Sequence, residues 1–150
     1  MRAVRLKIAK IHHAAQVPRL QTSGSAAADL HAAIDRDIEL KPGDRIAVPT
    51  GLKVEVPEGY VLSVRPRSGM AIKDGVSLIN SPGTIDSDFR GEVKVLLVNL
   101  SDKKVLIKNG DRIAQWLLEA VIPVEYVSVQ ENELTDTQRG GGGFGSTGKN

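Results

Sequence analysis

The chain has 150 residues, of which 41% are apolar and 25% charged, which is enough for one globular domain with its own core. It has no cysteine, which excludes disulfides, thiolate metal sites and cysteine nucleophiles. The net charge is only +2, with scattered basic residues and no apolar run long enough to cross a membrane, so neither a nucleic acid nor a membrane is an expected partner.

The N-terminal stretch carries basic residues without acidic ones, a composition also found in organelle transit peptides. A strand is the better interpretation, because the apolar residues at 4, 6 and 8 alternate with basic ones and predict one buried face. We therefore expect a cytoplasmic protein. In an extended segment the adjacent His12 and His13 would point to opposite faces, and His31 stands alone, so no zinc site built by the protein is expected.

From residue 46 onward the pattern is β nearly throughout. Apolar runs alternate with turn sequences such as Pro42-Gly43-Asp44 and Asn109-Gly110. The runs predict strands over residues 46–48, 52–56, 61–64, 76–79, 93–98, 105–107, 113–118 and 124–129. Many short strands at this spacing are typical of a sandwich, a jelly roll or a barrel.

One short helix is predicted over residues 68–73, ending at Asp74-Gly75. It follows Pro66-Arg67, so the amides of its first turn would lie next to arginines and offer an anion site. Elsewhere, residues 41–47 and 108–114 match at six of seven positions, and both predict a turn followed by a strand. A duplicated arm and convergence on good turn chemistry explain this match equally well.

Half of the last twelve residues, 139–150, are glycine. Such a segment cannot bury apolar surface alone, so we expect a catalytic domain over residues 1–138 and a mobile arm over 139–150. Arg139 and Phe144 are the side chains in this arm that could grip a ligand. Its G-x-x-x-x-G-K sequence resembles a phosphate-binding P-loop, but Asn150 follows where Ser or Thr is required, so that interpretation is rejected.

Two segments carry groups that suit nucleotide chemistry. Residues 64–69 combine arginines, a hydroxyl and helix-start amides, as in an oligophosphate cradle, although a surface turn with solvated arginines has the same composition. Residues 80–91 look like a hairpin, with the carboxylate of Asp86 three residues before the ring of Phe89. Hairpin backbone can pair with a nucleobase edge, but taken singly Asp86 is better interpreted as a turn-stabilising aspartate.

Taken together, five segments resemble the five motifs of the homotrimeric dUTPases, in the same order and at similar spacing. They are residues 27–30, 66–70, 80–92, 110–115 and 139–148, which together span nearly the whole chain. Five motifs in sequence are far more specific than any one of them. The family usually has tyrosine where this chain has Phe89, so the ring is kept and the hydroxyl is lost.

The resemblance implies an all-β, jelly-roll-like distorted barrel with one short helix. It implies a homotrimer in which each active site is shared between subunits. The activity implied is hydrolysis of dUTP to dUMP and pyrophosphate, which keeps uracil out of DNA and supplies dUMP for dTMP synthesis. A dCTP deaminase-like or bifunctional enzyme on the same barrel, and a nucleotide-binding protein without catalysis, stay open as alternatives.

The resemblance also implies a role for each motif residue. Asp86 would be the general base that activates a water for attack on the α-phosphorus. Asn80, Gly83, Thr84, Ile85, Phe89 and, as a lesser contact, Lys94 would bind the uracil and deoxyribose. The phosphate chain would be held by Arg67, Ser68, Gly69 and Gln115, and from the arm by Arg139, Gly145 and Ser146. Phe144, also in the arm, would stack on the uracil. Mg²⁺ would be held by the phosphates and by water, reaching Asp29 through water only.

Overall fold

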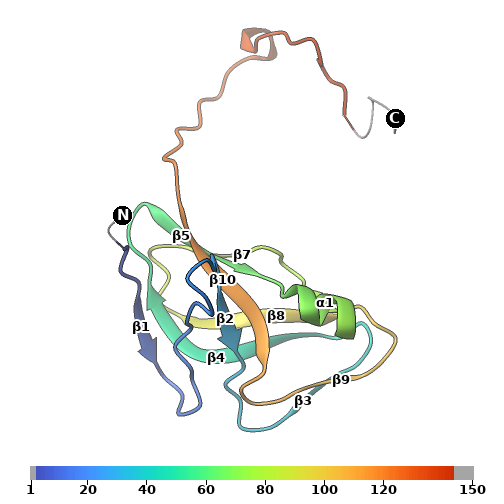
Figure 1. The fold of residues 1–150 in the computed structure, drawn as a ribbon. Coiled ribbons are helices and arrows are strands. Elements are labelled where there is room, and N and C mark those ends of the chain that lie inside the picture. The colour runs from blue at the N-terminus through green and yellow to red at the C-terminus, as the bar shows by residue number, and fades with distance from the viewer. Residues whose placement is uncertain (1–2, 144–150) are drawn as a thin grey trace.

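The structure is a computed structural model that describes residues 3–143, and it is built almost entirely from short antiparallel strands (Figure 1). The elements, in chain order, are β1 (Lys7–Lys10), β2 (Ala28–His31), β3 (Ile38–Leu40), β4 (Arg45–Glu55), β5 (Tyr60–Arg65), α1 (Ser68–Asp74), β6 (Val76–Leu78), β7 (Gly83–Ile85), β8 (Glu92–Asn99), β9 (Val105–Ile107), β10 (Arg112–Ala120) and the 3-10 turn η1 (Glu131–Glu133). This confirms the prediction of an all-β domain with one short helix.

Two four-stranded sheets enclose the core, one in the order β1-β4-β8-β6 and the other in the order β2-β10-β5-β7, and β3 pairs with β9 beside them. Aliphatic side chains from both sheets fill the interior, among them Leu52 and Leu97 from the first and Leu62 and Ile113 from the second. Because the chain has few aromatic residues, this core depends on branched aliphatic packing, to which Trp116 adds one buried ring.

The matching sequences at 41–47 and 108–114 fold in the same way. In each, an aspartate carboxylate accepts a hydrogen bond from the backbone N–H three residues earlier, at 3.0 Å for Asp44 and 2.7 Å for Asp111. Gly43 and Gly110 take left-handed backbone conformations with φ of 80° and 84°, which explains the glycine in both turns. One turn leads into β4 and the other into β10, so the predicted turn-and-strand units are confirmed.

The segment predicted as a hairpin over residues 80–91 has a different pairing. Its strand β7 pairs with β5, through Leu62 opposite Ile85, and the chain then crosses to β8 in the other sheet. The hairpin prediction is therefore wrong. The crossover has a structural consequence, because residues 80–91 bridge the two sheets at one end of the domain (Figure 1).

Three further expectations differ from the structure. The predicted strands 46–48 and 52–56 are parts of the single strand β4, whose pairing with β8 shifts register between Pro49 and Lys53. Strands β2 and β3 were not predicted. The predicted strand over 124–129 is wrong: residues 121–130 have no strand structure, and their apolar side chains are exposed, with Tyr126 at 93%.

The extended conformation assumed for His12 and His13 is also wrong. The Ala15 amide donates a hydrogen bond to the His12 carbonyl at 3.1 Å, which closes a turn at these residues. The chain is therefore not extended here, and the two imidazole rings lie 4.4 Å apart between centroids instead of on opposite faces. No helix among residues 3–143 has the length and apolar composition to cross a membrane.

Candidate active site

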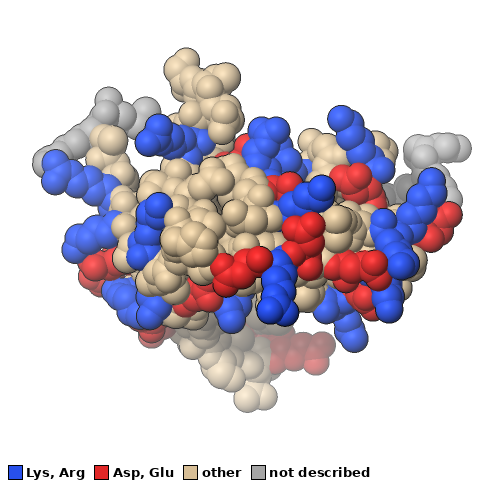
Figure 2. Space-filling view, turned by 90° about the horizontal axis from the view of Figure 1, so that it is seen from below, with Lys and Arg blue, Asp and Glu red and all other residues tan. Residues whose placement is uncertain are grey.

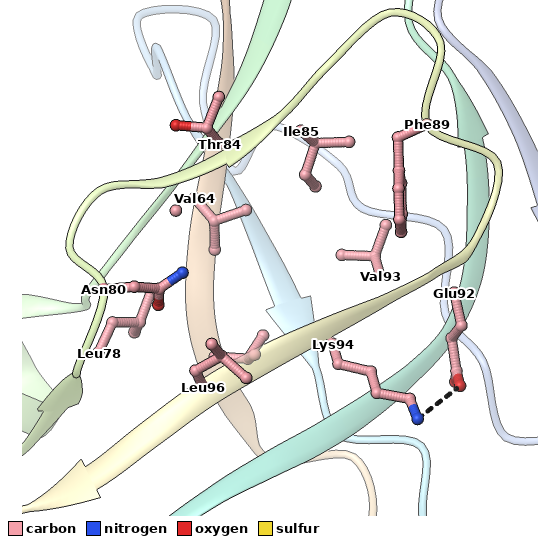
Figure 3. Close-up of a pocket in the computed structure, with 12 residues that line it drawn as sticks. Val64, Leu78, Asn80, Thr84, Ile85, Phe89, Glu92, Val93, Lys94 and Leu96 are labelled. Carbon is pink, nitrogen blue, oxygen red and sulfur yellow. Dashed lines mark ion pairs between the residues drawn. The ribbon is translucent and has the colours of Figure 1, made fainter.

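A cavity of about 200 Å³ lies between β8 and the segment that contains β7 (Figure 3). Its lining includes six residues predicted to bind base and sugar, namely Asn80, Gly83, Thr84, Ile85, Phe89 and Lys94. Val64, Leu78, Val93 and other apolar residues complete the walls. An apolar cleft with a few polar groups is the usual form of a small-molecule site.

Asn80 and Phe89 stand on opposite sides of this cavity (Figure 3). On the Asn80 side, a Cβ atom added to the buried Gly83 would lie 3.3 Å from the Asn80 amide nitrogen and 3.4 Å from Cβ of Val64. The first contact is tighter than most Cβ contacts, so glycine at 83 leaves room for the amide. The ring of Phe89 is 41% exposed and so remains available to a ligand.

Glu92 is a cavity residue to which the sequence assigned no role. One of its carboxylate oxygens accepts a hydrogen bond from the Gly51 amide at 3.0 Å, and the other lies 3.9 Å from the Lys94 ammonium (Figure 3). The carboxylate thus links the irregular part of β4 to the lysine at the cavity. Sequence patterns do not reveal this link, because it depends on the register shift within β4.

The carboxylate of Asp86 lies outside the lining of this cavity. Asp86 is exposed and directly follows β7, and with Thr84, Tyr60 and Val121 it borders a separate shallow hollow. Because successive residues of a strand face opposite sides, Ile85 points into the core while Thr84 and Asp86 face solvent. The carboxylate is therefore accessible to water and to a ligand that extends beyond the cavity.

A second cluster centres on Arg67, which follows β5. Its Nε donates to one oxygen of Asp29 at 2.8 Å, while Arg112 approaches the other oxygen at 3.4 Å. The side chains of Asp29 and Arg67 are 12% and 25% exposed, so this pair is largely buried, whereas the Arg112 side chain is 52% exposed. Asp29 was predicted to reach a metal through water, and its partnership with the two arginines was not foreseen.

The residues next to Arg67 fall where the sequence predicted them. Ser68 and Gly69 open α1, which ends at Gly75 in a left-handed conformation with φ of 66°. Gln115 on β10 donates through its side-chain amide to the Pro66 carbonyl at 2.9 Å, which ties β10 to the start of the helix. A groove of about 620 Å³ runs past this cluster, and its basic residues are Arg67, Lys73, Lys104 and Arg112.

His31 lies beside the same cluster, opposite Arg112 in the β2–β10 ladder. Burial lowers the pKa of His31 below its usual range; Asp29 opposes this effect, while Arg112 and Arg67 reinforce it. Its Nδ1 is buried, and among the described residues it has no hydrogen-bond partner. A neutral imidazole is the form that suits two neighbouring guanidinium groups.

Acidic side chains accompany the basic ones at this cluster, because Asp74 and Asp111 also line the groove. On the face shown in Figure 2, lysine and arginine side chains are interspersed with aspartate and glutamate over the whole surface. The groove and the base cavity share no lining residue. Among the described residues predicted to bind the phosphates, Arg67 and Gly69 line the groove, Ser68 and Gln115 line neither of the two, and none lines the base cavity.

After β10 the chain runs away from the sheets (Figure 1). Arg139, near the end of the described segment, donates from Nε to the Gly142 carbonyl at 2.7 Å and is exposed. Phe144, Gly145 and Ser146, which were also predicted to bind the nucleotide, lie outside the described residues.

Comparison with known proteins agrees with the motifs. Residues 13–148 match the dUTPase family model. A deoxyuridine 5'-triphosphate nucleotidohydrolase of Fusobacterium nucleatum is 48% identical over 149 residues, covering 99% of this chain and 100% of that protein. A Staphylococcus bacteriophage 80alpha dUTPase variant with dUpNHpp superposes with a TM-score of 0.83 at 24% identity, over 97% of this chain and 99% of that one. A dUTPase variant of phage phi11 of S. aureus, described with a structural Mg(II) ion, has a TM-score of 0.78 at 21% identity, over 87% of this chain and 100% of that one.

Proposed function

The chain belongs to the dUTPase family, and on that premise we propose that it hydrolyses dUTP to dUMP and pyrophosphate, with the deoxyuridine held in the cavity between β7 and β8. The observation that carries this proposal is that one cavity gathers six residues that the motifs predict for base and sugar. Relatives of nearly the same length carry the name of this activity.

Uracil recognition is assigned to Asn80 and to the backbone of β7. An amide side chain beside strand backbone offers donors and acceptors at fixed positions, which can match the edge of uracil. Cytosine presents the reversed pattern and would leave buried polar groups unpaired, which costs about 1–3 kcal/mol for each group. Thymine adds a methyl group to a cavity of only about 200 Å³.

Phe89 is assigned to the deoxyribose. Its ring stands across the cavity from Asn80, where a flat apolar surface can pack against the sugar (Figure 3). A ribose would bring a 2′-hydroxyl against this ring without a hydrogen-bond partner on it. The ring alone suffices for this steric selection, so it does not need the hydroxyl that tyrosine would supply.

Asp86 is assigned the role of general base. Asp86 directly follows the cavity residue Ile85 but does not itself line the cavity. Its exposed carboxylate can therefore contact the α-phosphate of a nucleotide whose base lies inside the cavity. The carboxylate accepts a proton from a water as the water oxygen bonds to the α-phosphorus, and the bond to the bridging oxygen breaks. Pyrophosphate leaves, and dUMP carries the new oxygen.

The phosphate chain is assigned to Arg67, Ser68, Gly69 and Gln115. Asp29 holds the Arg67 guanidinium in place while leaving other N–H groups free to donate. Gln115 uses one amide hydrogen for the Pro66 carbonyl and keeps the second for a phosphate oxygen. Donors fixed before the reaction stabilise the charge that develops on the leaving pyrophosphate.

Magnesium is assigned to the phosphates of the bound nucleotide. The described residues offer no cage of free carboxylates at the Arg67 cluster, because both oxygens of Asp29 already face guanidinium groups. Each carboxylate oxygen of Asp29 has a second lone pair. This lone pair can accept a hydrogen bond from a water bound to Mg²⁺, but the carboxylate is not free to bind the ion directly. When bound, Mg²⁺ would neutralise part of the triphosphate charge.

We further infer that the complete site is shared between the subunits of a homotrimer. Two observations support this: the base cavity and the phosphate groove share no residue, and residues 121–130 expose a run of apolar side chains that a partner chain could cover. Residues 139–150 would then close over the nucleotide as an arm, with Arg139 on the γ-phosphate and Phe144, Gly145 and Ser146 beside it.

Product analysis tests the activity and the point of attack together. Purified protein with Mg²⁺ is given dUTP, dTTP, dCTP and UTP separately, and pyrophosphate release is measured. We expect turnover of dUTP at least about 100-fold faster than of the others. In ¹⁸O-labelled water the label should enter dUMP; label in pyrophosphate, or equal turnover of all four nucleotides, contradicts the assignment.

A further inference from the structure

Three metal-binding side chains converge on the surface, apart from the cavity and the groove: His12, His13 and Asp35. The Nε2 atom of His12 lies 3.3 Å from one Asp35 carboxylate oxygen, and Nε2 of His13 lies 3.9 Å from the same oxygen. One ligand atom from each residue falls within 4.8 Å of the others. The two rings are tilted by 32° to each other, and both Nε2 atoms lie within 4 Å of the same carboxylate oxygen.

The backbone on the histidine side of this cluster is firmly held. The Ile11 amide donates to the Gly51 carbonyl at 2.8 Å, which fastens the turn to β4. Gly51 has φ of 65°, and a Cβ atom placed there would lie 2.6 Å from Cβ of His12. The His12 side chain is 24% exposed, so its position is largely set by packing.

The carboxylate side is equally anchored. Asp35 directly follows three buried residues, of which Ala33 donates its amide to the Pro49 carbonyl at 2.9 Å. The next amide, of Ile34, donates to the Asn109 side chain at 3.2 Å. The ligands therefore approach one another from two segments whose backbones the fold already fixes, which lowers the entropy lost when an ion binds.

We propose that His12, His13 and Asp35 form a binding site for Zn²⁺. Metal–ligand distances of about 2.0–2.1 Å in a tetrahedral site place neighbouring ligand atoms about 3.3 Å apart. The Asp35 oxygen already lies 3.3 Å from Nε2 of His12 and 3.9 Å from Nε2 of His13, and a small movement of the exposed His13 side chain closes the remaining gap. Two imidazoles and one carboxylate suit a borderline ion such as zinc rather than Mg²⁺, which prefers an all-oxygen shell. His13 and Asp35 are 80% and 74% exposed, so an ion can enter and water can supply the fourth ligand.

Binding requires a proton to change place on His12. Its Nδ1 accepts a hydrogen bond from the Ala14 amide at 3.2 Å, so in the neutral ring the proton resides on Nε2. When zinc occupies Nε2 that proton moves to Nδ1, and the half-buried Ala14 amide turns to water instead. This exchange weakens the site, so we expect roughly micromolar affinity rather than that of a closed structural zinc site.

Zinc binding to the full-length, metal-free protein tests this proposal. Isothermal titration with ZnCl₂ should give one ion per chain, and Co²⁺ should produce the strong visible absorption of a four-coordinate ion. His13→Ala and Asp35→Asn change exposed side chains, so they should keep the fold, and each should weaken zinc binding at least about 10-fold.

Asp37→Asn is the matched control, because it removes the same charge from an exposed position two residues away. It should bind zinc as the wild type does. Absence of zinc binding at 100 µM (about 100 times the expected dissociation constant) overturns the proposal. So does binding that His13→Ala and Asp35→Asn leave unchanged.

Discussion

The ring of Phe89 occupies the space that any side chain at Gly91 would need. A Cβ atom added to Gly91 would lie 2.6 Å from Cζ and 2.9 Å from Cε2 of Phe89, closer than such atoms approach in folded proteins. Gly91 is not among the glycines with positive φ, so space rather than backbone conformation demands glycine here. The position of the proposed sugar gate thus depends on a residue that touches no substrate.

The variant Gly91→Ala should displace the Phe89 ring and weaken selection against ribose. We expect kcat/KM for dUTP to fall about 10-fold, while the UTP-to-dUTP ratio of kcat/KM rises by a similar factor. Gly24→Ala is the control, since a Cβ atom there meets nothing within 4 Å. An unchanged ratio in Gly91→Ala would show that the ring does not act as the gate.

Replacement of Asp86 by asparagine removes the proposed base without changing its shape. Turnover of dUTP should fall by about 10²–10⁴-fold or more, because general base catalysis contributes that much. Affinity for the non-hydrolysable dUpNHpp should stay within about threefold, since the carboxylate is not assigned to binding. Asp88→Asn serves as the control, being the same change at a nearby exposed residue. Normal turnover by Asp86→Asn would exclude this residue as the base.

Deletion of residues 139–150 should remove activity but not the folded domain. An arginine that reaches a γ-phosphate can contribute about 10³-fold or more to kcat, so we expect a loss of at least 100-fold. The thermal midpoint should change little, because residues 139–141 are exposed and none of residues 139–143 belongs to the core. Full activity of the shortened chain would show that residues 139–150 do not take part in the active site.

His31 should make the fold less stable in mild acid. As the pH falls through the ordinary range of histidine, the unfolded chain takes up a proton on His31, while the lowered pKa keeps the folded imidazole neutral to a lower pH. The neutral His31 therefore makes its full contribution to the stability of the fold above the ordinary pKa range of histidine, and this contribution is lost as the pH falls. Between about pH 7.5 and about pH 5.5, the urea midpoint of the wild type should drop further than that of His31→Gln. Equal decreases in the two urea midpoints would show that His31 does not cause the loss of stability in acid.

Local patterns predicted most of the strands because each depends on side chains within a few residues. Alternating or continuous apolar runs placed β5, β8, β9 and β10 to within a few residues, and Asp74-Gly75 marked the end of α1. Strands β2 and β3 give no clear sequence pattern because they are short. In addition, β2 follows an alanine-rich stretch with weak strand preference. The run at 124–129 has the right pattern, but it pairs with no strand among residues 3–143.

The site relationships were less accessible to sequence reasoning. Asp29 and Arg67 are 38 residues apart, and their contact exists only because β2 and β5 both pair with β10. The convergence of His12 and His13 on Asp35 required knowing that a turn, not a strand, follows β1. Motif resemblance named the residues of the base cavity, but only the pairing of β7 with β5 explains why Asp86 lies outside it.

Mixing two inactive variants tests the shared dUTP site most directly. Arg67→Gln lacks the proposed phosphate ligand and Asp86→Asn lacks the proposed base, so neither should be active alone. Co-assembled in equal amounts, they should recover about one quarter of wild-type activity, because one site in four then combines an intact Asp86 from one chain with an intact Arg67 from another. A mixture no more active than the sum of its separate components would contradict a site shared between chains.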